Sequence, residues 1–523
     1  MTSPPFSEKA RLRNIAALVA AFAATRALAF SLGLRPLTSE TVWFMQFLDL
    51  DLLHHRLAQS LLHLHCQPPL LNALVGLAEK IAGPSYGELI VALYLILGLS
   101  AIISVYLSLT LLRVNSTVSL IVSLFLLLNP SEILSEFDPF YTIPVISVLC
   151  FMVLATICYL QRRSLGALYC LVGLAVLLTL TRSSYQWIWV IAVLAIVWWQ
   201  SPQSRTQIRT AGFVALFLSL LWPMKNEIIF HHFISTTWGP LSMAKHWDWN
   251  GPAVQNLERR GLLNTSLGPQ APAEDIKVQL QSKWQGPPSG FPELDDVIKK
   301  TGGSINWNSL AGLRLNDATQ RDISVLLRYD PKEYVISVLH SVAIYFYPST
   351  QYYAMFEDAN NQLIELAQYY QPLKPIDTVV RRVCCNVFGL PSSVPLQNAV
   401  QASRPNQHRT FTSVAKKLCI GALLLNGIVL ICIFSFASRA IWHDAHDRKV
   451  AAMVMSLTIA YSLIVVNLVE IGENQRYRFE TQALVVMVVV ILLQQLWDRR
   501  RAPEARTSEP ETAELSLVSL AGD

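Results

Sequence analysis

Two short stretches of this 523-residue chain carry side chains of the kinds that handle protons and phosphate groups. The stretch "FLDLDLL" contains Asp49 and Asp51, and the stretch "GENQRYRF" contains Arg476 and Arg478. A carboxylate within hydrogen-bond reach of a hydroxyl group can accept its proton, and the planar fork of arginine fits phosphate. Plainer interpretations exist, because the aspartates can cap the following helix and the arginines can extend from a span toward water.

The elements that must position these residues are helices that cross a membrane. Hydrophobic residues make up 52% of the chain and charged residues 15%, whereas a soluble globular protein carries about 25% charged residues. Apolar runs close to the roughly 20 residues needed to cross a bilayer predict ten spans, at 13–34, 86–112, 117–130, 138–160, 165–181, 185–199, 208–224, 416–438, 449–470 and 475–497. The predicted fold class is therefore an all-α polytopic membrane protein with about ten transmembrane helices.

The distribution of basic residues orients these spans. With the N-terminus inside, the runs "SPQSRTQIR" and "DRRRAPEAR" are cytosolic, as the positive-inside rule predicts. The domain prediction is a first membrane block (1–224) with a catalytic first outer loop (35–85), an external segment of mixed structure (225–415), a second membrane block (416–500) and a disordered cytosolic tail (501–523). The first outer loop is expected to form two interfacial helices separated at Pro68 and Pro69, where the second helix begins.

Charged residues near the predicted spans gather at the outer ends. They are Asp49, Asp51, Glu136, Asp138, Arg182, Lys225, Glu470, Glu473, Arg476 and Arg478. A proton-coupled or ion-coupled transporter is expected to place carboxylates or broken helices near the bilayer midplane. The pattern therefore favours chemistry at the outer surface over passage through the membrane.

Five motifs together resemble the GT-C superfamily of membrane glycosyltransferases, in its protein O-mannosyltransferase-like and aminoarabinose-transferase-like group. They are "FLDLDLL" with "HCQPPLLN", "FDPFYTIP", "LTRSSYQ", "WPMKN" and "GENQRYRFETQ". "HCQPPL" resembles the family's His-x-Pro-Pro-Leu element with an inserted Gln, and "WPMKN" departs further, with Lys225 where arginine is commoner. The resemblance covers the first seven spans and the last helix, about half of the chain, and leaves 242–415 unmatched.

The resemblance implies an inverting transfer of a sugar from a polyprenyl-phosphate carrier to an acceptor at the outer face. In that group an acidic residue of the first outer loop is the catalytic base, which carries over to Asp49, with Asp51 as the alternative. The departing polyprenyl phosphate needs its negative charge held by preorganised cations. The candidates for this role are Arg476, Arg478, Lys225 and Arg182.

Other polar residues near the motifs are candidates for substrate contacts: His65, Gln67, Asp138, Asn226, Glu473 and Tyr477. Asp138 fits an ordinary turn before a span equally well. A metal site at His63, His65 and Cys66 is not expected, because residues two apart on a helix do not face each other. No metal or cofactor is predicted, and no divalent cation is indicated.

The expected partners are the polyprenyl-phosphate-linked sugar, an acceptor (a glycan, a lipid or a protein) and membrane lipids, with no nucleic acid. A bacterial inner membrane is favoured over the endoplasmic reticulum. The alternatives are a lipid-linked glycan flippase or exporter, which would leave lipid composition unchanged, and a glycan ligase or polymerase, which need not carry the five motifs in this order.

Overall fold

The computed structural model describes residues 8–31, 34–36, 38–266, 268–269, 271–345, 445–472 and 474–507. In these residues every named element is helical, and the one β pairing is an isolated bridge between Ile298 and Ile305. The helices are α1 (Glu8–Ser31), α2 (Ser39–Trp43), α3 (Leu50–His63), α4 (Pro69–Ala82), α5 (Tyr86–Leu111), α6 (Ser116–Leu127), α7 (Pro130–Glu136), α8 (Thr142–Arg162), α9 (Leu165–Thr181), α10 (Trp187–Trp199), α11 (Arg205–Phe230), α12 (Gly239–Ala244), α13 (Pro252–Arg259), α14 (Ala273–Ser282), α15 (Pro292–Asp295), α16 (Leu310–Tyr329), α17 (Pro331–Tyr345), α22 (His446–Val469) and α23 (Asn474–Thr507), with short 3-10 turns at Gly83–Ser85 and Pro202–Ser204.

Six helical segments are long and apolar enough to cross a membrane: Glu8–Ser31, Pro69–Leu111, Thr142–Arg162, Pro202–Phe230, His446–Val469 and Asn474–Asp498. Three shorter apolar helices accompany them, Ser116–Leu127, Leu165–Thr181 and Trp187–Trp199. Each of these nine segments overlaps one of the ten predicted spans, and the tenth prediction, 416–438, lies outside the described residues. The helical membrane character of the chain is confirmed.

The structure differs from the sequence prediction in the secondary structure of the external segment and at two boundaries. The described part of the external segment is helical rather than of mixed structure, because amphipathic stretches such as α16 pack into small clusters of their own. Helix α11 continues to Phe230, past the predicted end of the first membrane block at 224. Helix α23 continues to Thr507, so the tail predicted to be disordered from 501 begins as helix, since extending an existing helix is easier than starting one.

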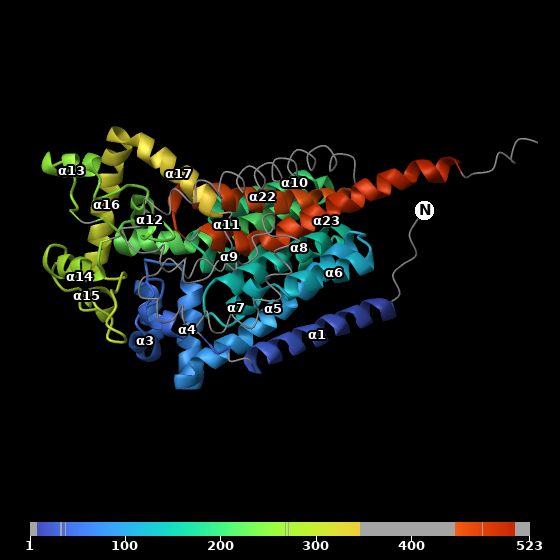
Figure 1. Ribbon diagram of the computed structural model, residues 1–523, viewed down its shortest axis with the longest axis horizontal. Helices are drawn as coiled ribbons and strands as arrows, with labels where there is room; N and C mark the ends of the chain where they lie inside the picture. The colour runs from blue at the N-terminus through green and yellow to red at the C-terminus, as the bar shows by residue number, and fades with distance from the viewer. Residues whose placement is uncertain are drawn as a thin grey trace, which may run out of the picture.

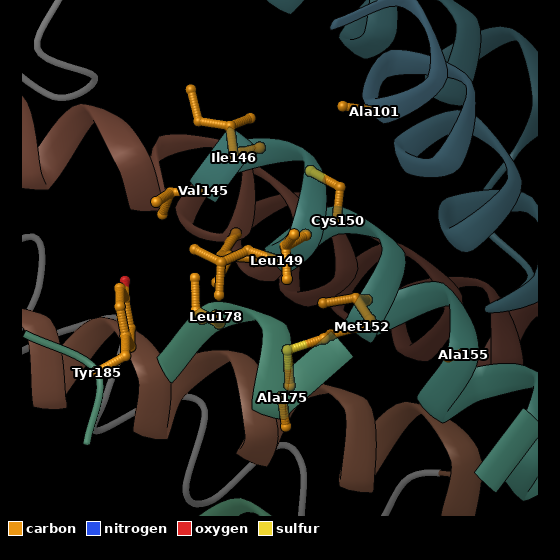
Figure 2. Packing of buried hydrophobic residues seen from close by; sticks show 14 of the residues in the cluster. Ala101, Val145, Ile146, Leu149, Cys150, Met152, Ala155, Ala175, Leu178 and Tyr185 are labelled. Atoms are coloured by element: carbon orange, nitrogen blue, oxygen red, sulfur yellow. The ribbon is translucent and has the colours of Figure 1, made fainter. Parts of the chain in front are cut away.

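Helix α8 lies at the centre of the bundle. In its most apolar 18-residue window 78% of the residues are buried, against 22% for α1 and 28% for α11. A helix that is apolar all round is expected in the interior, and α8 packs against both α5 and α9. Figure 2 shows Leu149 and Met152 of α8 on the side that faces Ala175 and Leu178 of α9. Helix α8 is therefore the central helix, and α1 and α11 lie at the periphery of the bundle.

A buried ion pair joins α1 to α7. Arg26 Nε and Nη2 lie 2.7 and 2.6 Å from the two carboxylate oxygens of Glu136, and Nη1 donates to the carbonyl of Leu127 at 2.8 Å. Gly98 makes room for this carboxylate, because a Cβ at that position would lie 2.7 Å from Glu136 Oε1. Glu136 thus serves a structural contact inside the bundle.

Residues 231–345, which form α12 to α17 and are called the head segment below, gather at one end of the bundle. Figure 1 shows α13 to α16 at the left, beside α3 and α4, with the start of α1 at the opposite end. Helix α17 returns from the head segment to the bundle, where Tyr334 and Ser341 donate to the carbonyls of Leu468 and Asn467 of α22. The predicted pair of helices is present, with α3 ending at His63 and α4 beginning at Pro69. All site candidates in the described residues lie toward this head end.

Candidate functional site

Asp49 is the N-cap of α3, with backbone angles of φ −60° and ψ 129°. Its side chain is 3% exposed and accepts hydrogen bonds from three backbone N–H groups: Asp51 at 3.2 Å, Lys300 at 2.5 Å and Thr301 at 3.3 Å. The first bond is the local cap that the sequence allowed as an alternative. The other two come from the head segment, 250 residues away in the chain, so Asp49 holds these parts together.

The head residues over Asp49 form a tight turn, residues 297–306, called the head hairpin below. It is closed by bonds from Lys299 N to Ser304 O and from Asn306 N to Val297 O, each 2.8 Å long. Gly302 takes φ +81°, and a Cβ there would lie 2.2 Å from Val42 Cγ1. Lys299 is buried and donates to the carbonyl of Phe44 at 2.8 Å. Burial lowers the pKa of Lys299 to about 8, opposed by the Cys66 thiol and the Asp49 carboxylate.

Asp51 has a different environment from Asp49. Its side chain is 40% exposed, and its carboxylate oxygens lie 3.6 Å from His55 Nε2 and 3.8 Å from Lys300 Nζ. These are loose surface contacts, which contribute little to stability. In this conformation Asp51 therefore has the more accessible carboxylate of the first loop.

His65 is enclosed by the head segment. Its Nδ1 lies 2.8 Å from Thr237 Oγ1, and its Nε2 lies 3.0 Å from the carbonyl of Asn308. Because a carbonyl can only accept, Nε2 carries the proton and Nδ1 accepts from Thr237. Burial, with a smaller effect from Lys225, lowers the pKa of His65 to about 3. His65 is thus a neutral histidine with both ring nitrogens bonded inside the protein.

Arg182 and Arg476 are called the arginine cluster below, whereas Arg478 lies near Tyr345 at the end of α17. All three arginines are at most 6% exposed. The Arg182 guanidinium lies 4.6 Å from the ring centre of Tyr141 and 4.2 Å from that of Tyr477. These contacts bring the C-cap of α9 against the first turn of α23.

A second guanidinium, that of Arg476, lies near the ring of Tyr477. The guanidinium of Arg476 lies 4.3 Å from the ring centre of Phe140 and 5.5 Å from that of Tyr477. Arg182 Nη2 also lies 3.3 Å from Glu480 Oε1, and the Tyr141 hydroxyl donates to Gln67 Oε1 at 3.3 Å. The structure therefore brings together Arg182, Arg476, Tyr477 and, through Tyr141, Gln67.

A tight turn sets the start of α23. Gly472 takes φ +126°, and its N–H donates to Asn474 Oδ1 at 2.9 Å. The Asn474 amide donates in turn to Asn467 Oδ1 at 3.0 Å and to the carbonyl of Glu470 at 2.8 Å. The first turn of a helix favours nearby negative charge. These hydrogen bonds fix the turn after Glu470 and therefore the position at which α23, with Arg476 and Arg478, begins. Glu473 lies outside the described residues.

Lys225 and Asn226 contact other parts of the head end. Lys225 Nζ donates to the carbonyl of Leu62 at 3.2 Å and to that of Leu64, and it lies 3.8 Å from the ring centre of Trp222. Asn226 Nδ2 donates to the carbonyl of Ile234 at 2.8 Å. Their hydrogen-bond partners are the end of α3 and the turn after α11, so these two residues lie in contacts separate from the arginine cluster.

Phe140 joins the first loop to the arginine cluster. Its ring centre lies 5.1 Å from that of Phe44 and 6.0 Å from that of Phe47, while Arg476 covers it as described. Asp138, two residues before Phe140, is buried in the turn before α8, and its carbonyl accepts from Phe140 N at 2.7 Å. Packed aromatic rings thus connect the segment before Asp49 to the arginine cluster.

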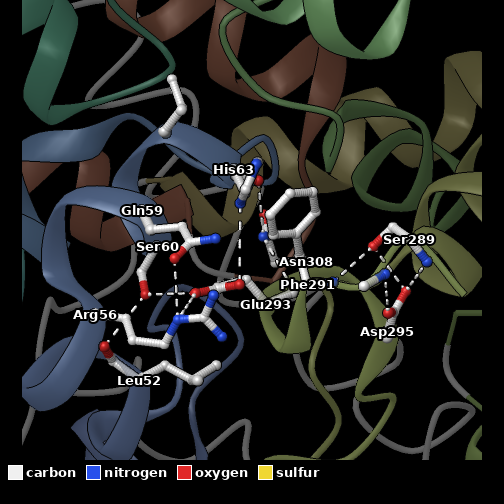
Figure 3. Close-up of polar contacts among 12 residues, drawn as sticks. Leu52, Arg56, Gln59, Ser60, His63, Ser289, Phe291, Glu293, Asp295 and Asn308 are labelled. Carbon is white, nitrogen blue, oxygen red and sulfur yellow. Dashed lines mark hydrogen bonds and ion pairs between the residues drawn. The ribbon is translucent and has the colours of Figure 1, made fainter.

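Figure 3 shows a buried carboxylate that the sequence analysis did not single out. Glu293 of α15 is fully buried, with Arg56 Nε at 3.5 Å and Ser60 Oγ at 3.4 Å from its Oε1. His63 Nδ1 lies 3.9 Å from Oε2, and burial lowers the His63 pKa against the opposing effect of Glu293. The two histidines of "HLHC" therefore face different partners, His63 toward Glu293 and His65 toward Thr237.

The aromatic partners Phe140, Tyr141 and Tyr477 and the carboxylate Glu480 complete the cluster. Of these, only Tyr477 was among the predicted site residues. The available signal was the run "FDPFYTIP", whose paired aromatic residues precede a span. Comparisons with family models, curated proteins and solved structures give no match for this chain.

Proposed function

We propose that this protein is an inverting membrane glycosyltransferase. It would move a sugar from a polyprenyl-phosphate donor to an acceptor hydroxyl at the head end of the bundle, which would be the outer face of the membrane. The observation that carries this proposal is the arginine cluster, in which Arg182 and Arg476 lie on the ring of Tyr477 at the first turn of α23. Guanidinium groups fixed by packing suit a phosphate whose charge grows during the reaction.

In the proposed reaction the acceptor oxygen attacks the anomeric carbon of the donor sugar. The bond between that carbon and the phosphate oxygen breaks, and its electron pair leaves with the polyprenyl phosphate. The acceptor proton passes to a carboxylate of the first loop. Asp51 can receive it in the present conformation, whereas Asp49 can do so only when the head hairpin moves away, because both of its oxygens accept backbone N–H groups.

The phosphate site is tested by binding of undecaprenyl phosphate to purified protein in nanodiscs, measured by native mass spectrometry. We expect wild type to retain the lipid and Arg476→Met to lose most of it. The matched control is Arg448→Met, which changes a buried arginine at the start of α22, where it donates to the carbonyls of Leu112 and Arg113. Equal retention by wild type and Arg476→Met would contradict the assignment of the cluster.

Transfer itself is tested with a panel of radiolabelled undecaprenyl-phosphate hexoses and pentoses in membranes that supply the acceptors. Release of undecaprenyl phosphate together with a labelled product supports the transferase. If the lipid binds but no donor in the panel gives a product, the proposed transfer reaction is wrong, whereas the assignment of the phosphate site still holds. Product analysis also separates a single-sugar transferase from a ligase or polymerase, which would attach a preformed glycan.

Lipid translocation is the rival function, and one observation favours it: Glu132, a carboxyl group buried inside the bundle. Intramembrane ionisable residues often mark transport pathways. Proteoliposomes loaded with fluorescent undecaprenyl-phosphate sugar distinguish the two. Appearance of the intact lipid in the other leaflet, with unchanged lipid composition, would support the flippase and count against transfer.

A further inference from the structure

A small cavity lies inside the bundle, lined in part by Phe479, Gln482 and Ala483 of α23. Its polar lining consists of Glu132 of α7, Gln482 of α23 and Asn129, and apolar side chains of α5, α6 and α8 form the rest. The cavity volume is about 10 Å³, which is close to the minimum needed to hold one water molecule. It therefore has the size for a water molecule and no larger ligand.

The polar atoms that face this cavity lack protein partners. Glu132 Oε1 and both the oxygen and the nitrogen of the Gln482 side chain have no hydrogen-bond partner. These side chains are only 6% and 4% exposed, respectively. A buried polar group without a partner is unfavourable, so bare atoms at this place would destabilise the bundle. A water molecule between Glu132 and Gln482 would bond to both.

The positive charge that lies near Glu132, the guanidinium of Arg26, is already paired with Glu136. Arg26 directs Nε and Nη2 to Glu136, and Nη1 to Thr25 Oγ1 and the carbonyl of Leu127. This pair is neutral as a unit, so an ionised Glu132 would add a second negative charge beside Glu136. Burial and a like charge both disfavour the ionised form of a carboxyl group. Charge balance therefore requires a proton or a bound cation at Glu132.

The lining favours the proton. Apart from Glu132, the only oxygen ligands that the lining offers are the carboxamides of Gln482 and Asn129, beside the Cys150 thiol, and Asn129 Oδ1 already accepts from Ser131 N at 3.0 Å. An alkali cation needs several oxygen ligands, whereas a protonated carboxyl needs one acceptor. The remaining lining residues, such as Ile102, Val105 and Phe479, are apolar and suit a neutral group.

We propose that Glu132 is a proton-binding site inside the bundle, whose carboxyl O–H donates to one water molecule that in turn donates to Gln482 Oε1. The site is independent of the proposed transferase activity. Because Gln482 belongs to α23, the helix that begins with Arg476 and Arg478, uptake or release of this proton changes the contact between α7 and α23. The ligand class is therefore the proton, and the element that responds is α23.

Infrared difference spectroscopy of full-length protein in nanodiscs, between neutral and alkaline pH, tests the site. The C=O stretch of a protonated carboxyl should be present in wild type at neutral pH and absent in Glu132→Gln. Glu79→Gln is the control, because Glu79 is a part-buried carboxylate near His54 outside the cavity and its loss should leave the band intact. A band that persists in Glu132→Gln, or is absent from wild type, would overturn the proposal.

A second variant keeps the carboxyl and removes its acceptor, which covers the case in which Glu132→Gln does not fold. Gln482→Leu should leave the band in place but shift its frequency upward, since the hydrogen bond to the carboxyl weakens. An unchanged frequency would rule out the water bridge. Thermal unfolding in sodium and in choline buffers decides the remaining alternative: stabilisation by sodium in wild type that is lost in Glu132→Gln would replace the proton by a cation.

Discussion

The two polar regions at the head end hold their charged groups in opposite ways. Around Asp49 the carboxylate is satisfied by backbone N–H groups of α3 and the head hairpin. In the arginine cluster the guanidinium groups of Arg182 and Arg476 lie on the faces of aromatic rings. A ring face holds the position of a cation, and Arg182 is held in addition by its ion pair with Glu480.

This difference bears on function. A group whose hydrogen bonds are all made to the protein's own backbone is built to hold the fold, as Asp49 does between the first loop and the head hairpin. A guanidinium placed by stacking is positioned to meet a ligand at its edge. Under the proposed function, the Asp49 region would chiefly hold the fold and the arginine cluster would chiefly bind the ligand, and each prediction below tests one side of this comparison.

The largest effect is expected from Arg182→Lys. Lysine keeps the positive charge but loses the planar group that lies between Tyr141 and Tyr477, so the change is not conservative at a stacked site. We expect the transfer rate to fall about 100-fold, as for loss of one preorganised donor to a developing anion. Rates are measured with the labelled donor found to be active in the panel above.

The matched control for this substitution is Arg35→Lys. Arg35 also stacks on a ring, with its guanidinium 4.0 Å from the centre of Phe30, but it lies in the segment after α1. This variant should retain the wild-type rate. If the two variants lose activity equally, the buried stacked arginine of the cluster is functionally no different from a stacked arginine at the surface.

The positions of the helices were predictable because each is encoded locally. The length of an apolar run identifies a span, and the paired prolines after Cys66 separate α3 from α4. The cap at Asp49 was also available from the sequence, since an aspartate directly before an apolar helix is a favoured N-cap. The arginines at the start of α23 followed from the same kind of local pattern.

The partners of these residues could not be predicted, because they are distant in the chain. Asn308 binds the backbone of His65 across 243 positions, and Arg26 meets Glu136 across 110. Nothing in the spacing of either residue specifies such a contact. Glu132 was missed for a related reason: its burial depends on α7 folding inward between α6 and α8, which a local pattern of charge does not reveal.

The next effect concerns the Asp49 side of the comparison. Asp49→Ala removes the cap of α3 and leaves the N–H groups of Lys300 and Thr301 without their acceptor, so the free energy of unfolding should fall by about 2 kcal/mol. Asp49→Asn retains one acceptor oxygen and should lose less. Both are measured by chemical unfolding in detergent. An Asp49→Ala protein as stable as wild type would show that the head hairpin is held elsewhere.

A smaller effect per pH unit is expected from acidification, through His65. Its pKa is lowered to about 3 by burial, against about 6.5 in an unfolded chain. Between these values the unfolded chain binds a proton that the folded protein does not, so stability falls as the pH falls below 6.5. The slope should reach about 1.4 kcal/mol per pH unit from this residue. It should be shallower in His65→Gln, and equal slopes in the two proteins would contradict the assignment.

The smallest effect on stability, and the sharpest test of the comparison, is expected from Asp51→Asn. The carboxylate of Asp51 is 40% exposed and makes only loose contacts with His55 and Lys300, so the free energy of unfolding should change by less than about 0.5 kcal/mol. If Asp51 accepts the acceptor's proton, transfer should nevertheless be lost, because an amide cannot act as a base. A stable Asp51→Asn protein with normal turnover would return the catalytic role to Asp49 and require the head hairpin to move during the reaction.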